Sequence, residues 1–303
     1  MKDFLTLRDF SSNELLNIIK LAHDMKTGKD KSTPLKNKKV ALIFEKSSTR
    51  TRVSFEVGVY ELGGYPLFLS KNDLQLGRGE TLKDTARTLS RYVDGIMIRT
   101  FGHSKLEELA KYASIPVING LTDDFHPCQV MADVLTIYEK FNKLKGINVA
   151  FVGDGNNMAN SWVYGAAKFG MNFRVATPKG YECKSEYVKD AEKLANKTGS
   201  IIFQTNDPLL AVKDADVIYT DVWTSMGQEE EAEKRKKIFE HFQVNKTLID
   251  ATGKENTIFM HCLPAHIGEE VTEDVFESEA SVVFDEAENR LHAQKAIMAW
   301  LMG

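Results

Sequence analysis

Short apolar runs alternate with amphipathic stretches along the whole chain, and this alternation limits the folds that it can adopt. Apolar runs are typical of parallel strands buried on both faces, and apolar residues spaced three and four apart are typical of the helices that cover them. Strands are predicted at residues 39–44, 66–69, 95–99, 116–119, 148–152, 173–176, 200–204, 217–220, 258–261 and 281–284. Helices are predicted at residues 12–26, 54–62, 81–92, 105–112, 129–143 and 286–301. The fold class is therefore α/β, with doubly wound parallel sheets.

The length of 303 residues suits two domains, each able to bury its own core. The apolar spacing from Gln129 to Lys143 predicts a helix that joins the two halves. We expect one domain at residues 1–142, a second at residues 143–285, and a C-terminal helix at residues 286–303 that packs back on the first domain. Two domains joined by interdomain helices imply a cleft between them.

Composition and charge exclude several classes of partner. A net charge of -4 and a pI near 6.0 give no basic field that would gather nucleic acid. Charged residues such as Arg8 and Asp9 interrupt the N-terminal region, so no apolar run predicts a signal peptide or membrane span. The three cysteines, Cys128, Cys183 and Cys262, are widely spaced and suit free thiols in a reducing compartment. We therefore expect a cytoplasmic protein.

The segment Ser48-Thr49-Arg50-Thr51-Arg52 follows a predicted strand and precedes a predicted helix. Free backbone N–H groups and the positive end of the helix dipole favour an anion there, hydroxyls can donate to it, and arginine offers a planar fork that matches phosphate. Helix capping alone would explain one hydroxyl but neither Arg50 nor Arg52. The segment therefore predicts an oxyanion site.

The stretch from Phe44 to Arg52 resembles the carbamoyl phosphate signature of the aspartate and ornithine carbamoyltransferases. A second signature of that family is matched by His126-Pro127-Cys128-Gln129. The resemblance implies that His126 hydrogen-bonds the carbonyl oxygen of the donor and that Gln129 binds its carbamoyl amide. Taken by itself, a histidine before a proline is more often a capping or packing residue.

The resemblance extends to residues outside these two signatures. It implies that Arg99, at the end of a predicted strand, reaches both phosphate and carbonyl oxygen, and that Arg290 contacts the carbamoyl group. It also implies that a neighbouring subunit lends Gln75 to the phosphate site, which requires an oligomer, expected to be a homotrimer or a multiple of trimers. Without the resemblance, Arg99 could be an exposed strand-end residue and the Gly-rich segment around Gln75 a flexible loop.

In the second half, the residues from Gly153 to Met158 follow a strand and at first resemble a dinucleotide fingerprint. The third glycine of that pattern is replaced by Met158, and the next strand lacks the acidic residue that binds a ribose hydroxyl. The family resemblance implies instead that Asn157 contacts an amino acid substrate. It also implies that Asp221 pairs with an ornithine amino group and that Ser225 and Met226 lie in a loop closing over the substrate.

The motif His261-Cys262-Leu263-Pro264 also follows a predicted strand. A buried free cysteine is one interpretation, and a metal site through His261, Cys262 and His266 is a poor one because no fourth ligand is evident. The resemblance implies that Cys262 binds the side-chain amine of ornithine and that the carbonyls of Cys262 and Leu263 accept from the carbamoyl amide. No metal and no other cofactor is expected.

The activity implied by the resemblance is transfer of the carbamoyl group from carbamoyl phosphate to ornithine, a reaction of arginine metabolism. The first domain would bind carbamoyl phosphate through Ser48, Thr49, Arg50 and Thr51 with the residues above, and the second would bind ornithine. The residues expected to act in catalysis are Arg50, Arg99, His126 and Cys262. Three alternatives remain: transfer to another amine, a nicotinamide-dependent oxidoreductase, and a non-catalytic paralogue.

Overall fold

The computed structural model describes residues 2–72, 74, 79–225, 227 and 229–303, and the chain forms two compact units. The first unit comprises Met1–Leu135 and Glu288–Gly303, and the second comprises Thr136–Ala287. The chain passes from one unit to the other within α5 (Pro127–Phe141) and again within α12 (Val283–Met302). The boundary expected from the sequence, between residues 142 and 143, lies just after α5.

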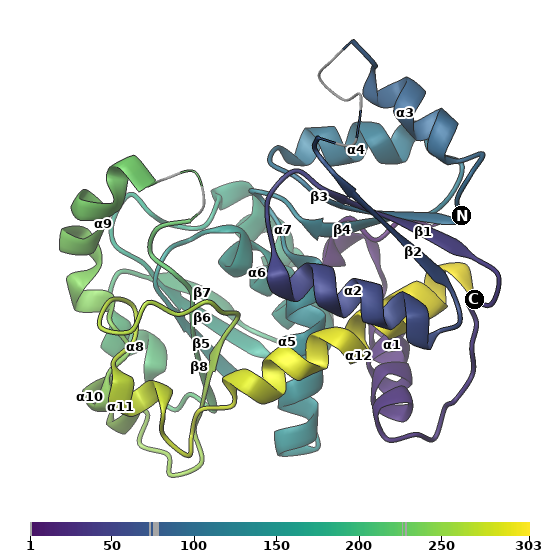
Figure 1. Ribbon diagram of the computed structural model, residues 1–303. Coiled ribbons are helices and arrows are strands. Elements are labelled where there is room, and N and C mark those ends of the chain that lie inside the picture. Colours follow the sequence, from purple (N-terminus) through teal and green to yellow (C-terminus); the bar gives the residue numbers. More distant parts are fainter. Residues whose placement is uncertain (1, 73, 75–78, 226, 228) are drawn as a thin grey trace. The chain divides into compact units, whose positions relative to one another are not determined.

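The first unit is built on a four-stranded parallel sheet in the order β2-β1-β3-β4. Its strands are β1 (Lys39–Phe44), β2 (Tyr65–Ser70), β3 (Gly95–Arg99) and β4 (Val117–Leu121). Its helices are η1 (Leu7–Asp9), α1 (Ser12–Lys26), α2 (Thr49–Glu61), α3 (Leu82–Leu89) and α4 (His103–Tyr112), together with parts of α5 and α12. Figure 1 shows α3 and α4 on one face of this sheet and α2 on the other. The sheet is therefore covered on both faces, as the apolar strands require.

The second unit is built on a five-stranded parallel sheet in the order β7-β6-β5-β8-β9. Its strands are β5 (Asn148–Val152), β6 (Asn172–Ala176), β7 (Ile202–Thr205), β8 (Val217–Thr220) and β9 (Ile258–His261). Its helices are α6 (Asn157–Phe169), α7 (Ser185–Thr198), α8 (Pro208–Val212), η2 (Glu229–Glu231), α9 (Ala232–Phe239), η3 (Glu240–Phe242), α10 (Lys246–Asp250) and α11 (Glu273–Phe276).

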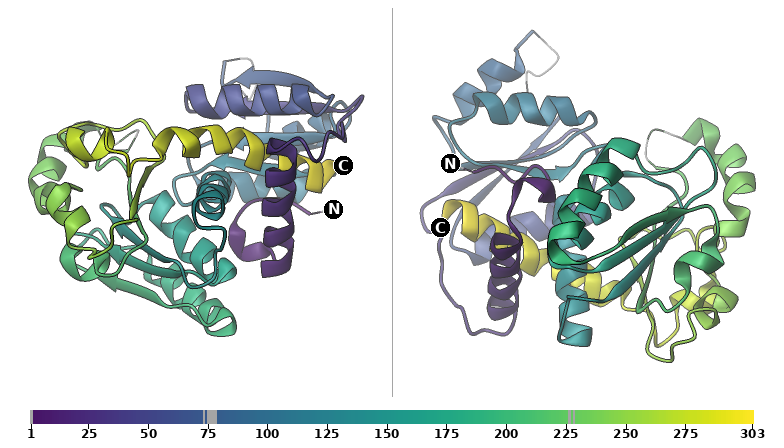
Figure 2. Two further views of the ribbon diagram at one scale, coloured as in Figure 1. Left: turned by 90° about the horizontal axis from the view of Figure 1, so that it is seen from below. Right: turned by 180° about the vertical axis from the view of Figure 1, so that it is seen from behind.

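Alternate residues of β5 serve two different cores. Phe151 stacks on Tyr219 of β8, on the face where Trp162 of α6 lies against Tyr219. Ala150 and Val152 point to the opposite face, where they join the apolar cluster that includes α8. Because successive side chains of a strand face opposite sides of the sheet, a fully apolar strand supplies both cores at once. Figure 2 shows helices on both faces of this five-stranded sheet.

The structure confirms the predicted fold class, α/β with two parallel sheets, and most predicted strands within two residues. The strand predicted at residues 281–284 is wrong: Ser281 forms a single bridge to Phe259, and α12 begins at Val283. The helix predicted from residue 54 begins at Thr49 instead, so the anion-binding segment lies in the first turn of α2. None of the helices in the described part of the chain combines the length and apolar character needed to cross a membrane.

The loop after β5 contains a close backbone approach that only glycine permits. A Cβ atom on Gly155 would lie 2.4 Å from the nitrogen of Cys183 and 2.5 Å from the carbonyl oxygen of Tyr181. The Gly155 N–H donates to that same carbonyl over 2.9 Å. The two backbone segments therefore touch directly and hold the loop against the residues that precede α7.

We expect Gly155→Ala to lower the free energy of unfolding by about 2 kcal/mol or more, because the obstructing atoms belong to backbone that must shift as a whole. Urea unfolding followed by circular dichroism measures the change. Gly102→Ala is the control, because Gly102 has a φ of -64° and an added Cβ atom would meet nothing nearer than the Ser104 hydroxyl oxygen at 3.7 Å. Equal stability of the two variants would contradict the close approach.

Candidate active site

The site residues predicted in the first unit follow three neighbouring strands. Phe44, the last residue of β1, is in register with Arg99, the last residue of β3, and the Glu45 N–H donates to the Arg99 carbonyl over 2.9 Å. His126 follows β4, the next strand along the sheet. Parallel strands end at one edge of their sheet, and β1 and β3 flank the point where the strand order reverses. Ligands of open α/β sheets bind at such a point.

The N-terminus of α2 brings two arginines together on one hydroxyl. Ser48 caps the helix by accepting from the Thr51 N–H over 3.2 Å. The buried Thr51 hydroxyl accepts from Arg290 Nη2 of α12 over 2.8 Å, and Arg99 Nη1 lies 3.5 Å from the same oxygen. Two guanidiniums and the positive end of a helix therefore converge in the first turn of α2, which is an arrangement suited to an anion.

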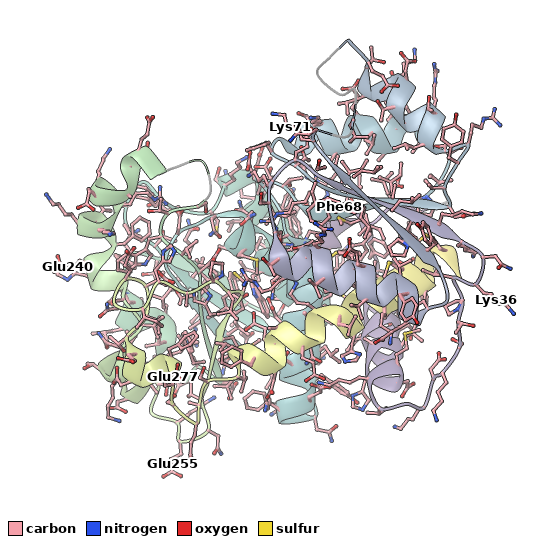
Figure 3. The ribbon with its side chains drawn as sticks, viewed as in Figure 1. Lys36, Phe68, Lys71, Glu240, Glu255 and Glu277 are labelled. Atoms are coloured by element: carbon pink, nitrogen blue, oxygen red, sulfur yellow. The ribbon has the colours of Figure 1, made fainter. Side chains whose placement is uncertain are left out.

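The remaining residues of the predicted anion segment differ in their surroundings. Thr49 is exposed and Arg50 is half-buried. Arg52 pairs with Glu56 over 3.2 Å, and its guanidinium lies 3.6 Å from the ring centre of Phe68, which Figure 3 labels on β2. Arg52 thus has a structural role on the outside of α2, unlike Arg99, whose guanidinium reaches the Thr51 hydroxyl.

His126 and Gln129 lie at the beginning of α5, and both are buried. Burial lowers the pKa of His126 well below its ordinary value of 6.5, and the neighbouring cations Arg290 and Arg99 lower it further. The imidazole is therefore neutral near pH 7. The Gln129 side-chain amide donates to Asp133 over 2.9 Å within the same helix. A neutral imidazole can donate one hydrogen bond without adding charge to this cationic region.

In the second unit, predicted site residues again follow neighbouring strands, here β5, β8 and β9. Asp221, directly after β8, accepts from Asn156 Nδ2 over 2.7 Å and from the Cys262 thiol over 3.0 Å. Asn156 follows β5, and Cys262 follows β9. The sheet order therefore brings an amide, a carboxylate and a thiol into one polar cluster, at the point between β5 and β8 where the strand order reverses.

Two of the free backbone N–H groups in the first turn of α6 already have an acceptor, the side chain of the capping residue Asn156. Asn156 accepts from the N–H groups of Met158 and Ala159 over 2.9 and 3.3 Å. Dinucleotide-binding folds leave these first-turn N–H groups to a pyrophosphate, so the capped helix agrees with the sequence argument against that ligand. Asn157, predicted to contact an amino acid, is half-buried and is the first residue of α6.

A buried arginine that the sequence did not single out anchors the loop after β8. Arg235 of α9 pairs with the Asp154 carboxylate and donates to the Trp223 carbonyl. Burial raises the pKa of Asp154 to about 6, against the opposing effect of Arg235. A run as rich in Glu and Lys as residues 228–237 is typical of the solvated start of a helix, yet Arg235 is 3% exposed. The sequence offers one weak signal of burial, Phe239, which lies about one helical turn after Arg235.

Two predicted site residues, Gln75 and Met226, lie outside the described residues. Ser225, the remaining member of the predicted loop, is half-buried and follows the residues that Arg235 anchors.

The three cysteines differ in their surroundings. Burial raises the pKa of Cys128 and of Cys183 to about 12, whereas Cys262 is half-buried beside Asp221. Cys262 is thus the thiol that belongs to a polar site.

Two groups of side chains in the described part of the chain have the spacing of metal ligands: Asp221, His261 and Cys262, and His266, Glu269 and Glu270. In the first group, both ring nitrogens of His261 already have hydrogen-bond partners, and the Cys262 thiol already donates to Asp221. In the second group, Lys236 lies 3.0 Å from Glu269. A metal ion would have to displace these contacts, and the expectation of a metal-free site stays a prediction.

The neutral, buried His126 predicts a pH dependence of stability. Its folded-state pKa lies below the unfolded value, so the unfolded chain takes up a proton first as the pH falls, and stability present above pH 6.5 is lost below it. We expect His126→Asn to remove this loss, which can reach about 1.4 kcal/mol per pH unit. Urea unfolding between about pH 7.5 and pH 5 measures it. His241→Asn, at an exposed histidine, should keep the acid sensitivity of the unchanged protein.

Comparison with known proteins gives matches over both units. The carbamoyl-P binding domain of the aspartate/ornithine carbamoyltransferases matches residues 2–139, and the Asp/Orn binding domain of the same family matches residues 145–301. An ornithine carbamoyltransferase of Anoxybacillus flavithermus is 58% identical and aligns with 99% of this chain and 96% of its own length. One from Thermococcus kodakarensis is also 58% identical, over 100% of this chain and 96% of its own.

Solved structures agree with these relatives. The ornithine carbamoyltransferase from Pyrococcus furiosus superimposes with a TM-score of 0.96 at 54% identity, over 100% of this chain and 97% of that one. The anabolic ornithine carbamoyltransferase from Campylobacter jejuni gives a TM-score of 0.94 at 46% identity, over 99% of each chain. With its two parallel sheets, its ordered motifs and full-length relatives of this similarity, the chain belongs to the aspartate/ornithine carbamoyltransferase family, among its ornithine carbamoyltransferases.

Proposed function

We propose that the protein transfers the carbamoyl group of carbamoyl phosphate to the side-chain amine of L-ornithine, giving L-citrulline and phosphate. The observation that carries this proposal is the convergence of Arg99 and Arg290 on the Thr51 hydroxyl at the N-terminus of α2. A dianionic acyl phosphate needs several cations and N–H donors at one place, and the first turn of α2 has them. The match of residues 2–139 to a carbamoyl-P binding domain supports this donor, and the full-length relatives named ornithine carbamoyltransferase support the acceptor.

In this proposal the phosphate binds to the first turn of α2, and the carbamoyl group is held beside it. The phosphate-binding residues are Ser48, Thr49, Arg50, Thr51 and Arg99, with Gln75 lent by a neighbouring subunit. His126 and Arg99 donate to the carbonyl oxygen, where negative charge develops in the transition state. Gln129 and the carbonyls of Cys262 and Leu263 hold the carbamoyl amide, and Arg290 contacts the carbamoyl group. Donors fixed before the reaction stabilise the developing oxyanion without reorganisation.

The proposed acceptor site lies in the polar cluster around Asp221. Ornithine has two amino groups, so its site needs carboxylate and carbonyl acceptors rather than further cations. Asp221 pairs with an ornithine amino group, Cys262 contacts the side-chain amine, and Asn157, Ser225 and Met226 complete the pocket. The bonds from Asn156 and the Cys262 thiol support this role, because they fix the carboxylate in one orientation while no cation of the described residues pairs with it.

The reaction needs no dedicated general base. The neutral side-chain amine attacks the carbonyl carbon, the new C–N bond forms, and the bond from that carbon to the phosphate oxygen breaks. The proton lost by the amine passes to the departing phosphate, which becomes inorganic phosphate. Catalysis then rests on positioning the two substrates, on the charges of Arg50 and Arg99, and on the hydrogen bond that the neutral His126 donates.

We further propose that the enzyme is a homotrimer or a multiple of trimers, because the Gln75 contact requires a second subunit. This assembly and a cytoplasmic location stay predictions.

A substrate panel tests the function. With carbamoyl phosphate as donor, we expect the purified protein to use ornithine with a kcat/KM at least about 100-fold higher than that for putrescine, acetylornithine or aspartate. Each of these amines either lacks a charged group that the site would pair with or has an additional charged group for which the site has no partner. Colorimetric measurement of citrulline and other ureido products follows the reaction. Preference for another amine would overturn the acceptor but leave the donor standing.

A matched pair of variants tests the role of Asp221. We expect Asp221→Asn to raise the KM for ornithine about tenfold or more, because a charge-assisted bond becomes a neutral one, and to leave the KM for carbamoyl phosphate unchanged. Asp216→Asn is the control: Asp216 precedes the same strand, at the opposite edge of the sheet, and pairs with Lys254 over 2.6 Å. Steady-state kinetics with each substrate varied in turn compares them. An unchanged ornithine KM in Asp221→Asn would refute the assignment.

A further inference from the structure

His261 is the last residue of β9 and is fully buried, directly before the two residues proposed to contact the substrates. Its Nδ1 accepts a hydrogen bond from the Leu263 N–H over 2.9 Å. Its Nε2 lies 3.0 Å from the carboxylate of Glu270, which is also fully buried. The ring therefore bridges the start of the loop after β9 and a carboxylate further along that loop.

The partners of the ring fix its tautomer. A backbone N–H can only donate, so His261 Nδ1, which faces the Leu263 N–H, bears no hydrogen. The hydrogen of the neutral ring is then on Nε2, where it points to the Glu270 carboxylate. Glu270 also accepts from the His266 N–H over 2.6 Å, which holds the carboxylate itself in place. Both bonds reach the same carboxylate oxygen, Oε1, so the His261 ring and the His266 backbone share one acceptor.

The strand end is held independently of the ring. The His261 N–H donates to Glu286 over 2.9 Å, and the Tyr219 hydroxyl donates to the other oxygen of that carboxylate over 3.0 Å. Glu286 is fully buried in the first turns of α12. The backbone of residue 261 is thus fixed by Glu286 and its ring by Glu270, so the ring can impose a position on whatever it binds.

The His261 ring binds the backbone N–H of Leu263, a residue in an unfavourable backbone conformation. Leu263 has a φ of 59°, in the left-handed region that residues with a Cβ rarely adopt. Such a conformation persists only where surrounding contacts impose it. The bond from the Leu263 N–H to His261 is one such contact, and the peptide unit it holds carries the Cys262 carbonyl. The directions of the Cys262 and Leu263 carbonyls therefore depend on the His261 ring.

We propose that His261 is a positioning residue of the transfer reaction: its Nδ1 holds the Leu263 amide so that the carbonyls of Cys262 and Leu263 face the carbamoyl amide, while Glu270 holds the ring. The proposal rests on the proposed function, and it assigns to the imidazole no contact with substrate and no proton transfer. The side chains of His261 and Glu270 act through the backbone alone.

Two substitutions of one residue separate this role from simple packing. Asn at position 261 has a side-chain oxygen near the place of Nδ1 and can accept from the Leu263 N–H, whereas Gln reaches toward Glu270 and leaves that N–H without its acceptor. We expect His261→Gln to lower kcat about 100-fold, the effect of a small misplacement in a reacting geometry, and His261→Asn to restore at least about a tenth of the wild-type kcat. The KM for carbamoyl phosphate should stay within about threefold in both.

We would measure the rate of citrulline formation per folded molecule and the KM for each substrate. The folded fraction of each variant is taken from thermal unfolding. His241→Asn, at an exposed histidine, is the control with unchanged kcat. Equal kcat in the Asn and Gln variants, or a higher kcat in Gln, overturns the positioning role. A wild-type protein that forms no citrulline would instead overturn the proposed function, so the two failures are distinct.

A second pair keeps the proposal testable if the His261 variants do not fold. Glu270→Gln retains an acceptor for the His261 Nε2–H, whereas Glu270→Leu removes it and frees the ring to turn. We expect kcat to fall about tenfold further in Glu270→Leu than in Glu270→Gln, with the KM for carbamoyl phosphate unchanged in both. A wild-type kcat in Glu270→Leu would overturn the proposal.

Discussion

Parallel pairing of the strands is the constraint on which both candidate binding regions depend. In the first unit, the bond from the Glu45 N–H to the Arg99 carbonyl continues the ladder between β1 and β3 past its last residue pair, so the segments after both strands start side by side. In the second unit, the order β5-β8-β9 does the same for Asn156, Asp221 and Cys262. Residues far apart in the sequence meet because their strands end at one edge.

The two regions have opposite electrostatic character, and each is built for one kind of ligand. Thr51 is approached by two guanidiniums, and the same cations help to keep His126 uncharged. The carboxylate of Asp221 is met by an amide and a thiol, which orient it without neutralising it. A binding region in which charges of one sign gather favours a ligand of the opposite sign. The arrangement therefore suits an anionic donor and a cationic acceptor.

Much of this fold could be predicted because the strands are buried on both faces. A run such as Val40 to Phe44 is apolar throughout and bounded by polar residues, so its limits are clear from the sequence. The wrong prediction of a strand at residues 281–284 shows where a short apolar run is not a sufficient indication of a strand. Val282 and Val283 are buried and Phe284 is exposed at the start of α12, and a short apolar run does not distinguish a strand from the buried beginning of a helix.

The site was predictable to the extent that its residues follow strands in recognisable motifs. The contacts of Thr51 with Arg99 and Arg290 agree with that expectation, although the roles of these residues stay predictions. Arg235 was missed because it lies in a run rich in Glu and Lys, and its partner Asp154 is distant in the sequence. Such a pair is determined by tertiary packing, which one sequence does not reveal.

The bond between Arg290 and Thr51 also bears on how the protein is made. The first unit is discontinuous, because its last part, Glu288–Gly303, is synthesised after the whole of the second unit. A ribosome-bound chain can form the four-stranded sheet early, but Thr51 can bond to Arg290 only after residues 136–287 have been synthesised. Until then, the first turn of α2 lacks one of the two guanidiniums that approach Thr51 in the folded protein.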